Sequence, residues 1–241
     1  MKLDQHFIID ANVLLKITEL AKIKKNEIVL EIGAGTGNLT KLLLNKAKFV
    51  YAIEKDEKLF SELKKINNKK LKPILGNALK INFPNFDKLV ADIPYSISEP
   101  LIQRLIYEDF KLAVLLFPEN FVKTLLEKNT KLSLISKLFF EIKLDQEVFP
   151  ESFYPKPKVL SRIVLIKPKI TKKHELILKE FIKQRDKKAK NALREAIIRG
   201  SGKTKREVRN ILKDFEIDKK VASLSLKELK KIRKFVNSLN F

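Results

Sequence analysis

The sequence contains no cysteine, which excludes disulfide bonds, thiolate metal sites and a cysteine nucleophile. It contains only two histidines, His6 and His174, so we do not expect a metal centre built on several imidazoles. No apolar run approaches the roughly 20 residues that a membrane-spanning helix needs, and the first residues lack the cleavage site of a secretory signal. These absences favour a cytoplasmic protein without a membrane span or a metal.

Acidic residues are scarce relative to basic ones. The 241 residues include 51 Lys and Arg against 29 Asp and Glu, a formal net charge of +22. At 44% hydrophobic and 33% charged residues, the composition is that of a globular protein. The positive excess predicts a polyanionic partner, above all a nucleic acid. Lysines that merely solvate the surface of a lysine-rich protein are the alternative, and composition alone leaves both open.

From residue 28 onward, short apolar runs alternate with segments of helical spacing. We predict helices at 36–46, 55–67, 98–108 and 118–128, and strands at 28–32, 49–53, 71–75, 88–91 and 112–117. This alternation is typical of βαβ units around a mainly parallel sheet. The segments 139–149 and 159–167 alternate like strands at a sheet edge. The proline-rich stretch between them is predicted to be a loop, because proline has no N–H for a ladder.

The character of the chain changes after Pro168, where helices are predicted at 174–184, 187–199, 204–213 and 225–239. Residues 169–241 hold 23 Lys and Arg but only 9 Asp and Glu. We therefore expect two domains, residues 1–168 with the sheet and residues 169–241 as a basic helical domain that binds RNA. The run at 200–210 clusters five charges beside glycines, and a groove for an RNA backbone is favoured there over a solvated surface.

The stretch "EIGAGTG" at 31–37 follows a predicted strand and opens a predicted helix. Gly33 and Gly35 let the backbone turn tightly and approach a ligand, although the spacing does not meet the dinucleotide fingerprint G-x-G-x-x-G. Glu31 would repel a pyrophosphate but suits a cationic ligand. Glu54 ends the next strand, where a carboxylate can accept both ribose hydroxyls. A tight turn without a ligand is the alternative.

Two further polar positions follow predicted strands. Asn77 can bond the edge of an adenine, and Asp92 comes directly after the fourth strand. Ligands of open parallel sheets bind beyond the carboxyl ends of the strands, so these positions should converge with the glycine turn. The side chain of Asp92 and the carbonyl of Ile93 offer acceptors for an exocyclic amine, and Tyr95 offers a stacking face worth about 1–3 kcal/mol per base. An ordinary turn would explain Pro94 but not its neighbours.

Taken in order, the motifs resemble those of the S-adenosylmethionine-dependent rRNA adenine N6,N6-dimethyltransferases, in their archaeal branch. The matching stretches are "EIGAGTG", "AIEK" at 52–55, "GNAL" at 76–79, "ADIPYSIS" at 91–98 and "FYPKPKVLS" at 153–161. The resemblance implies a Rossmann-like class I methyltransferase fold, α/β with a seven-stranded sheet, and a small all-helical C-terminal domain. It also implies dimethylation of two adjacent adenosines near the 3′ end of small-subunit (16S) rRNA, with a role in small-subunit biogenesis. The partner would be a pre-30S particle and the protein a monomer.

The resemblance also assigns site residues. Those near S-adenosylmethionine would be Gln5, His6 and Ile8, which close over it; Glu31, Gly33 and Gly35, beside its methionine part; Glu54, on its ribose; and Asn77, on its adenine. Those around the target adenine would be Asp92, which also lies at the cofactor, with Ile93, Pro94 and Tyr95, and Phe153 on the other face of the base. Packing under the proline loop is the alternative for Phe153.

Two positions depart from the family's pattern. Asn77 stands where Asp is usual, which predicts weaker cofactor binding without loss of it. Asp92 stands where Asn is usual, and an ionised carboxylate is an acceptor only. We therefore expect activity to persist and the efficiency of the second methylation to depend on Asp92. No base of shifted pKa is required, because a methylated amine sheds its proton easily.

Two other functions compete with this interpretation. One is an RNA-binding assembly factor of pre-ribosomal particles with little or no catalysis, which the departures at Asn77 and Asp92 favour. The other is an amine methyltransferase of small molecules or proteins, which the basic tail disfavours. Cofactor binding distinguishes the first from an enzyme, and a steep dependence of affinity on salt distinguishes an RNA partner from a neutral substrate.

Overall fold

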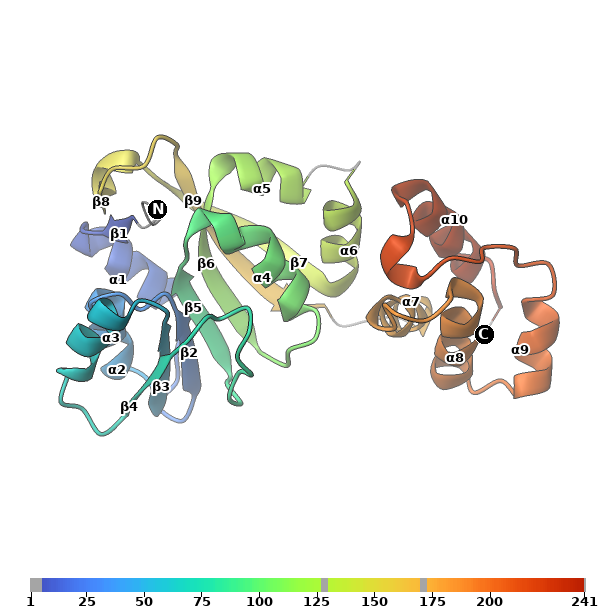
Figure 1. Cartoon of the computed structure of the whole chain (residues 1–241), viewed down its shortest axis with the longest axis horizontal. Helices are drawn as coiled ribbons and strands as arrows, with labels where there is room; N and C mark the ends of the chain where they lie inside the picture. Colours follow the sequence, from blue (N-terminus) through green and yellow to red (C-terminus); the bar gives the residue numbers. More distant parts are fainter. Residues whose placement is uncertain (1–5, 127–129, 170–172, 241) are drawn as a thin grey trace. The chain divides into compact units, whose positions relative to one another are not determined.

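The computed structural model describes residues 6–126, 130–169 and 173–240 (Figure 1). Contacts divide the chain into two units, one formed by Met1–Leu126 and Phe140–Pro168 and the other by Glu127–Phe139 and Lys169–Phe241. The predicted boundary at residue 168 is correct for the tail. The expected first domain is wrong at 127–139, because this segment belongs to the helical unit.

The first unit is built on a seven-stranded sheet of order β4-β3-β2-β5-β6-β9-β7. Strands β2 to β6 pair in parallel and β9 and β7 add to them antiparallel, so the predicted α/β class is confirmed. Their bounds are β2 (Ile28–Ile32), β3 (Phe49–Glu54), β4 (Leu71–Leu75), β5 (Lys88–Asp92), β6 (Leu112–Pro118), β7 (Phe140–Val148) and β9 (Ser161–Pro168). Strand β9 lies between β6 and β7, so only β7 is at the sheet edge.

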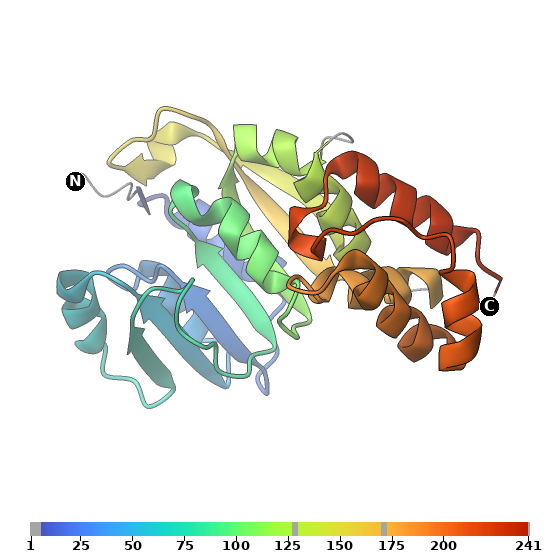
Figure 2. The same ribbon diagram turned by 45° about the vertical axis from the view of Figure 1, so that its right-hand side comes forward.

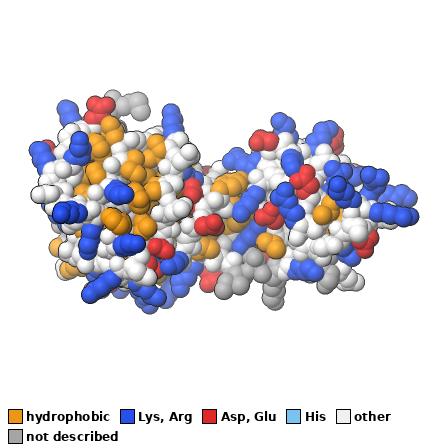
Figure 3. Space-filling model, turned by 90° about the horizontal axis from the view of Figure 1, so that it is seen from below, with side chains coloured by type: hydrophobic (Ala, Val, Ile, Leu, Met, Phe, Trp, Pro, Cys, Tyr) orange, Lys and Arg blue, Asp and Glu red, His pale blue; other side chains and the backbone are white. Residues whose placement is uncertain are grey.

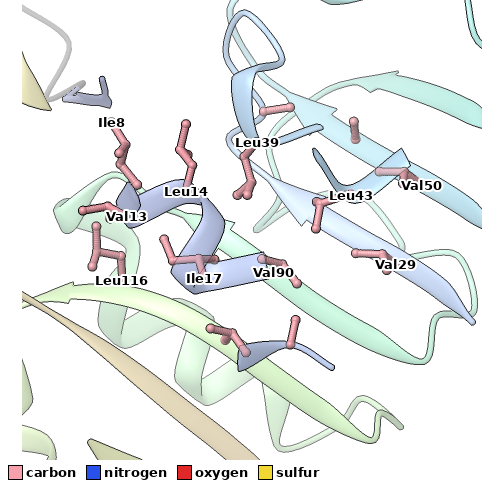
Figure 4. Packing of buried hydrophobic residues seen from close by; sticks show 14 of the residues in the cluster. Ile8, Val13, Leu14, Ile17, Val29, Leu39, Leu43, Val50, Val90 and Leu116 are labelled. Carbon is pink, nitrogen blue, oxygen red and sulfur yellow. The ribbon is translucent and has the colours of Figure 1, made fainter. Parts of the chain in front are cut away.

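Helices cover both faces of this sheet. On one face, α1 (Ala11–Leu20), α2 (Asn38–Leu44) and α3 (Glu57–Lys64) pack apolar side chains on alternate residues of the strands, as Ile17, Leu43 and Val90 show in Figure 4. On the other face lies α4 (Ser98–Leu105), with its apolar side buried (Figure 2). Helix α5 (Glu119–Leu126) follows β6 directly. The predicted helices had not included α1, which the Asp10 side chain caps by accepting from the N–H of Asn12 at 2.9 Å.

A separate two-stranded sheet joins the start of the chain to the proline-rich stretch. Strand β1 (Phe7–Ile8) pairs antiparallel with β8 (Phe153–Tyr154), so the prediction of a pure loop over this stretch is wrong at these two residues. The prolines flank the pair without entering it, and both residues of β8 keep their N–H groups. The N–H of Ile9 adds a bond to the carbonyl of Ser152 at 2.8 Å. This pairing fixes the segment before α1 across the end of the large sheet.

The second unit is helical, as predicted for the tail. It contains α6 (Lys131–Phe139), α7 (Lys173–Lys183), α8 (Ala189–Ser201), α9 (Lys205–Ile211) and α10 (Leu226–Asn237). Helix α6 belongs here because its apolar residues face those of α7 and α10; Leu138, Phe181 and Ile232 line one small cavity. Capping boxes begin α9 and α10. None of the helices in the described ranges is long and apolar enough to cross a membrane.

Candidate active site

A cavity lies beyond the carboxyl ends of β2, β3, β4 and β5, which are neighbours in the sheet. Its space is about 660 Å³, counting the part open to solvent. The residues that line it are His6, Phe7, Ile32, Gly33, Ile53, Glu54, Lys55, Gly76, Asn77, Ala78, Asp92, Pro94 and Ile97. The structure thus brings together the four predicted strand-end positions Gly33, Glu54, Asn77 and Asp92. It places one polar group at the end of each of four parallel strands.

The glycine turn after β2 needs its glycines for close approach as well as for backbone angles. Gly33 has a φ of 74°, and a Cβ there would lie 3.1 Å from the carbonyl oxygen of Asp92. Gly35 has a φ of 56°, and its Cβ would lie 3.0 Å from the ring of Phe7. Both values are in the left-handed region that favours glycine. The turn therefore packs directly against β5 and β1, and it leaves the backbone of Gly33 open to the cavity.

Glu54 is 3% exposed and its carboxylate is held by backbone donors. One oxygen accepts from the N–H of Gly35 at 2.8 Å, and the other accepts from Lys55 and Asp56 at 2.8 and 2.9 Å. These bonds fix the carboxylate at the wall of the cavity. Its oxygens retain acceptor capacity for the hydroxyls of a bound ribose.

Three acids gather at this end of the sheet, Glu31, Glu54 and Asp92. Glu31 is 1% exposed and accepts from the Thr40 hydroxyl at 2.6 Å. Burial, with the nearby charges of Glu54 and Asp92, raises the pKa of Glu31 to about 8. Burial likewise raises the pKa of Asp92 to about 7, against the effect of a hydrogen bond from the backbone of Ile8. The cluster disfavours negative charge in the absence of a cation.

Asn77 begins the turn that follows β4. Its side-chain oxygen accepts from the N–H of Leu79 at 2.9 Å, which leaves its amide group oriented along the cavity wall and one lone pair on the oxygen. Arg104 of α4 supports the same turn: its guanidinium donates to the carbonyl of Ala78 and lies 3.4 Å from the centroid of the Phe83 ring. Nothing in the sequence pattern identified Arg104, which comes from a different element.

The stretch after β5 forms a short 3-10 helix, η1 (Tyr95–Ile97). The hydroxyl of Tyr95 is hydrogen-bonded to the Oγ of Ser161, the first residue of β9. His6 lies over this region, with its ring centroid 5.7 Å from that of Tyr95 and its Nδ1 2.7 Å from the carbonyl oxygen of Pro155. Residues of η1, β9 and the N-terminal segment therefore meet at the end of β5.

Several predicted site residues lie near the cavity without lining it. Ile8 and Ile93 are buried at 3% and 2% exposure, and Phe153 is buried at 3% within the same core cluster as Ile8. The burial of Phe153 favours the packing alternative for its side chain. Glu31, Gly35 and Tyr95 flank the cavity from behind the lining residues. Gln5 lies outside the described residues.

Sequence reasoning missed the apolar part of the cavity. Phe7, Ala78 and Ile97 line it. Of these, Phe7 had a detectable signal, since it precedes a buried residue in an alternating stretch, but the pairing that places it is formed with residues far along the chain. The described residues contain no group of three His, Asp or Glu side chains arranged to hold a metal ion.

Comparison with known proteins identifies the family. The model of the family described as "Ribosomal RNA adenine dimethylase" matches residues 1–234. A protein of Pyrococcus furiosus named "Probable ribosomal RNA small subunit methyltransferase A" is 35% identical over 98% of this chain and 91% of its own length. The chain belongs to the ribosomal RNA adenine dimethylase family. It is therefore an S-adenosylmethionine-dependent rRNA adenine dimethyltransferase.

Other members and solved structures agree with this assignment. A similarly named protein of Methanosphaera stadtmanae is 37% identical to this rRNA adenine dimethylase over 95% of the chain and 90% of its own length. A dimethyladenosine transferase from Plasmodium falciparum is 31% identical, with a TM-score of 0.66 over 94% of this chain and 95% of that one. The 23S rRNA methyltransferase ErmE has the same TM-score at 18% identity and shows the shared fold.

Proposed function

We propose that this dimethylase methylates the N6 amines of two adjacent adenosines near the 3′ end of small-subunit rRNA, as a step in small-subunit biogenesis. The names of its relatives in two archaea, which specify the small subunit, support this choice of substrate. The observation that carries the chemistry is the position of Asp92 and Pro94 on the wall of the strand-end cavity. We further propose that it acts in the cytoplasm as a monomer on a pre-30S particle.

The cavity fits S-adenosylmethionine by its size and by its donors and acceptors. A volume of about 660 Å³ lies in the range of pockets for ligands of this class, about 300–1,000 Å³. We propose that Glu54 holds the ribose, Asn77 the adenine amine and the open backbone at Gly33 the methionine part. His6 covers the mouth, together with Gln5. The cluster of Glu31, Glu54 and Asp92 favours a cationic centre, because a positive charge relieves the repulsion among the three acids.

The target adenine is proposed to lie against Asp92, Pro94 and Tyr95. The Asp92 carboxylate accepts an N–H of the exocyclic amine, and the Ile93 carbonyl is the second proposed acceptor. The hydrogen bond from Tyr95 to Ser161 fixes the ring on which the base stacks. Phe153 supports the site through its pairing with Ile8, since the side chain is buried in this structure.

Bound S-adenosylmethionine supplies an electrophilic methyl group, and the residues around it position the amine. Withdrawing an N–H toward Asp92 turns the nitrogen lone pair out of the ring and toward the cavity. Holding two reactants in line accounts for most of the acceleration in such a reaction. With a pKa raised to about 7, Asp92 can also take up the proton that the methylated amine sheds.

The test uses purified protein, radiolabelled S-adenosylmethionine and small subunits from cells that lack this modification. We expect label in adenine, and nucleoside mass spectrometry should give N6,N6-dimethyladenosine from a fragment of the 3′ region. The Asp92→Ala variant should bind the cofactor and transfer little label. Label in another base, or in the large subunit alone, would contradict the proposed substrate. Binding of small subunits without any transfer would favour an assembly factor.

A further inference from the structure

The second unit contains a basic groove between α6 and α10. Its lining includes four cations, Lys137 from α6 and Lys230, Arg233 and Lys234 from α10. No carboxylate is among the described residues that line it. On the face shown in Figure 3, Lys and Arg side chains cover much of the helical unit, at right. A surface of this charge attracts an anion.

The sequence of α10 keeps cations together along one side of the helix. Lys230 is three residues from Arg233 and four from Lys234, so these side chains are neighbours. Like charges at such spacings destabilise a helix by about 0.2–0.5 kcal/mol per pair. The acid of α10, Glu228, does not relieve them, because its carboxylate bonds Lys219 at 2.9 Å and caps the helix at Ser225. An external anion would remove this repulsion.

A buried hydroxyl also faces the groove. Ser133 of α6 is 0% exposed, lines the groove, and its Oγ has no hydrogen-bond partner among the described residues. A buried polar group without a partner costs about 1–3 kcal/mol. An anion with several acceptor oxygens, held by the cations above it, would supply the missing partner. The exposed Asn237 and Ser238 add polar groups at one end of the groove.

The groove that the sequence favoured is different and less charged in effect. The run at 200–210 contributes Lys205 and Arg209 to a groove between α8 and α9. That groove contains the carboxylate of Glu195, which bonds Lys187 at 2.6 Å, and its Arg199 pairs with Glu180 at 3.5 Å. Part of its positive charge is therefore neutralised within the protein, whereas the lining of the α6–α10 groove holds no acid.

We propose that the α6–α10 groove binds consecutive phosphates of the rRNA substrate and is the main phosphate site of the helical unit. The proposal rests on the proposed function for the choice of RNA. Lys230 and Lys234 are about 6 Å apart along the helix axis, a separation comparable to that of neighbouring phosphates on an RNA strand. Ser133 donates to one of these phosphates from the floor of the groove.

The experiment measures binding of a transcript of the 3′ region of small-subunit rRNA as a function of salt. The variant Lys230→Gln/Lys234→Gln should lower the slope of log K against log salt by about 1.4–1.8, at about 0.7–0.9 for each phosphate contact. The matched control, Lys205→Gln/Arg209→Gln, removes the same charge from the α8–α9 groove and should lower the slope by less than half as much. A wild-type slope for the first variant, or equal losses for both, would overturn the proposal.

A third variant tests the groove without a change of charge. Ser133→Ala should weaken RNA binding about threefold, leave the salt slope unchanged and not reduce stability, since it removes an unpaired buried hydroxyl. Unweakened RNA binding by Ser133→Ala would remove this residue from the site. Affinity for S-adenosylmethionine, measured on each preparation, should match wild type. Failure of wild type to methylate adenine would refute the proposed function, whereas normal methylation with unchanged slopes would refute the groove alone.

Discussion

The two ends of β2 and β5 carry buried acids in opposite surroundings. At the amino end, Glu27 is 3% exposed and forms a 3.0 Å ion pair with Lys88, which is itself buried. Burial acts to raise the pKa of Glu27, but hydrogen bonds from the Lys24 backbone and from Lys88 outweigh it, so the pKa lies below its ordinary value. Asp87 bonds the backbone of Ile28 and also has a lowered pKa. Every acid at this end has a partner.

At the carboxyl end of the same strands, Glu31 and Asp92 have raised pKa values and no cationic partner is assigned to either by the contacts around them. The comparison separates a cluster that stabilises the fold from one that waits for a charge. A binding site for a cation can be assembled from acids only where the fold leaves them unpaired, and the pairs at the opposite end help to offset what this costs.

The two ends should respond to pH in opposite senses. Lowered pKa values at Glu27 and Asp87 give stability that is present above their unfolded values of 4.5 and 3.8 and is lost as pH falls through the folded values. Raised values at Glu31 and Asp92 reduce stability as pH rises from those unfolded values toward about 8 and 7, with no further change above them.

The largest effect is expected from breaking the amino-end pair. Lys88→Met leaves Glu27 buried without its buried partner, and such a change costs about 3–5 kcal/mol of unfolding free energy. Urea unfolding and hydrogen exchange of peptides from β2 and β5 measure it. The control is Lys111→Met, which removes a cation that also contacts Glu27, at 3.3 Å, but is 61% exposed; its cost should be about 0–1 kcal/mol. Similar costs for both variants would contradict the distinction.

At the carboxyl end, removing an acid should affect activity rather than stability. Asp92→Ala should lower the rate of methyl transfer by about 10²–10³-fold, the range for loss of one group that stabilises a transition state electrostatically. Single-turnover transfer to small subunits measures it. Asp92→Asn keeps an acceptor oxygen and should retain most of the first methylation, so its ratio of dimethyl to monomethyl product tests the role of the charge. Wild-type rates for Asp92→Ala would exclude contact with the amine.

The sequence was sufficient for the carboxyl end because parallel strands share an edge. Once strands at 28–32, 49–53, 71–75 and 88–91 are predicted, the residues that follow them must converge. Gly33, Glu54, Asn77 and Asp92 do line one cavity. This inference needs only local patterns and the rule that connects them.

Features that depend on distant pairing could not be predicted in this way. Strand β1 is two residues long and its partner β8 lies in a proline-rich stretch, so neither has a periodic signal. The pair of Glu27 and Lys88 joins residues of two strands that are separated in sequence by two others. Phe153 was expected to touch substrate, but its buried side chain is set by the β1 pairing, which the loop prediction had excluded.

The unpaired acids should make cofactor binding depend on pH and on charge. Below the raised pKa values, binding of a cation must expel a proton, so affinity for S-adenosylmethionine should increase from pH 6 to pH 8 by up to about tenfold per pH unit for one coupled proton. S-Adenosylhomocysteine carries the same amino-acid group without the sulfonium charge and is the matched control, with an expected change below threefold. Calorimetry at several pH values measures both. Parallel pH curves for the two ligands would show that the acids do not sense the charge.

The smallest effect should come from a neutral contact at the same end of β5. Removing the Tyr95 hydroxyl or the Ser161 hydroxyl deletes one hydrogen bond, which is worth about 1 kcal/mol, or about fivefold in kcat/KM for RNA. Tyr95→Phe and Ser161→Ala should each show this loss, and the double variant should lose no more, because the two groups act through one bond. The loss should be the same at pH 6 and pH 8, unlike that of Asp92→Ala, since no charge is involved. Additive losses would show that Ser161 acts on the base through another residue.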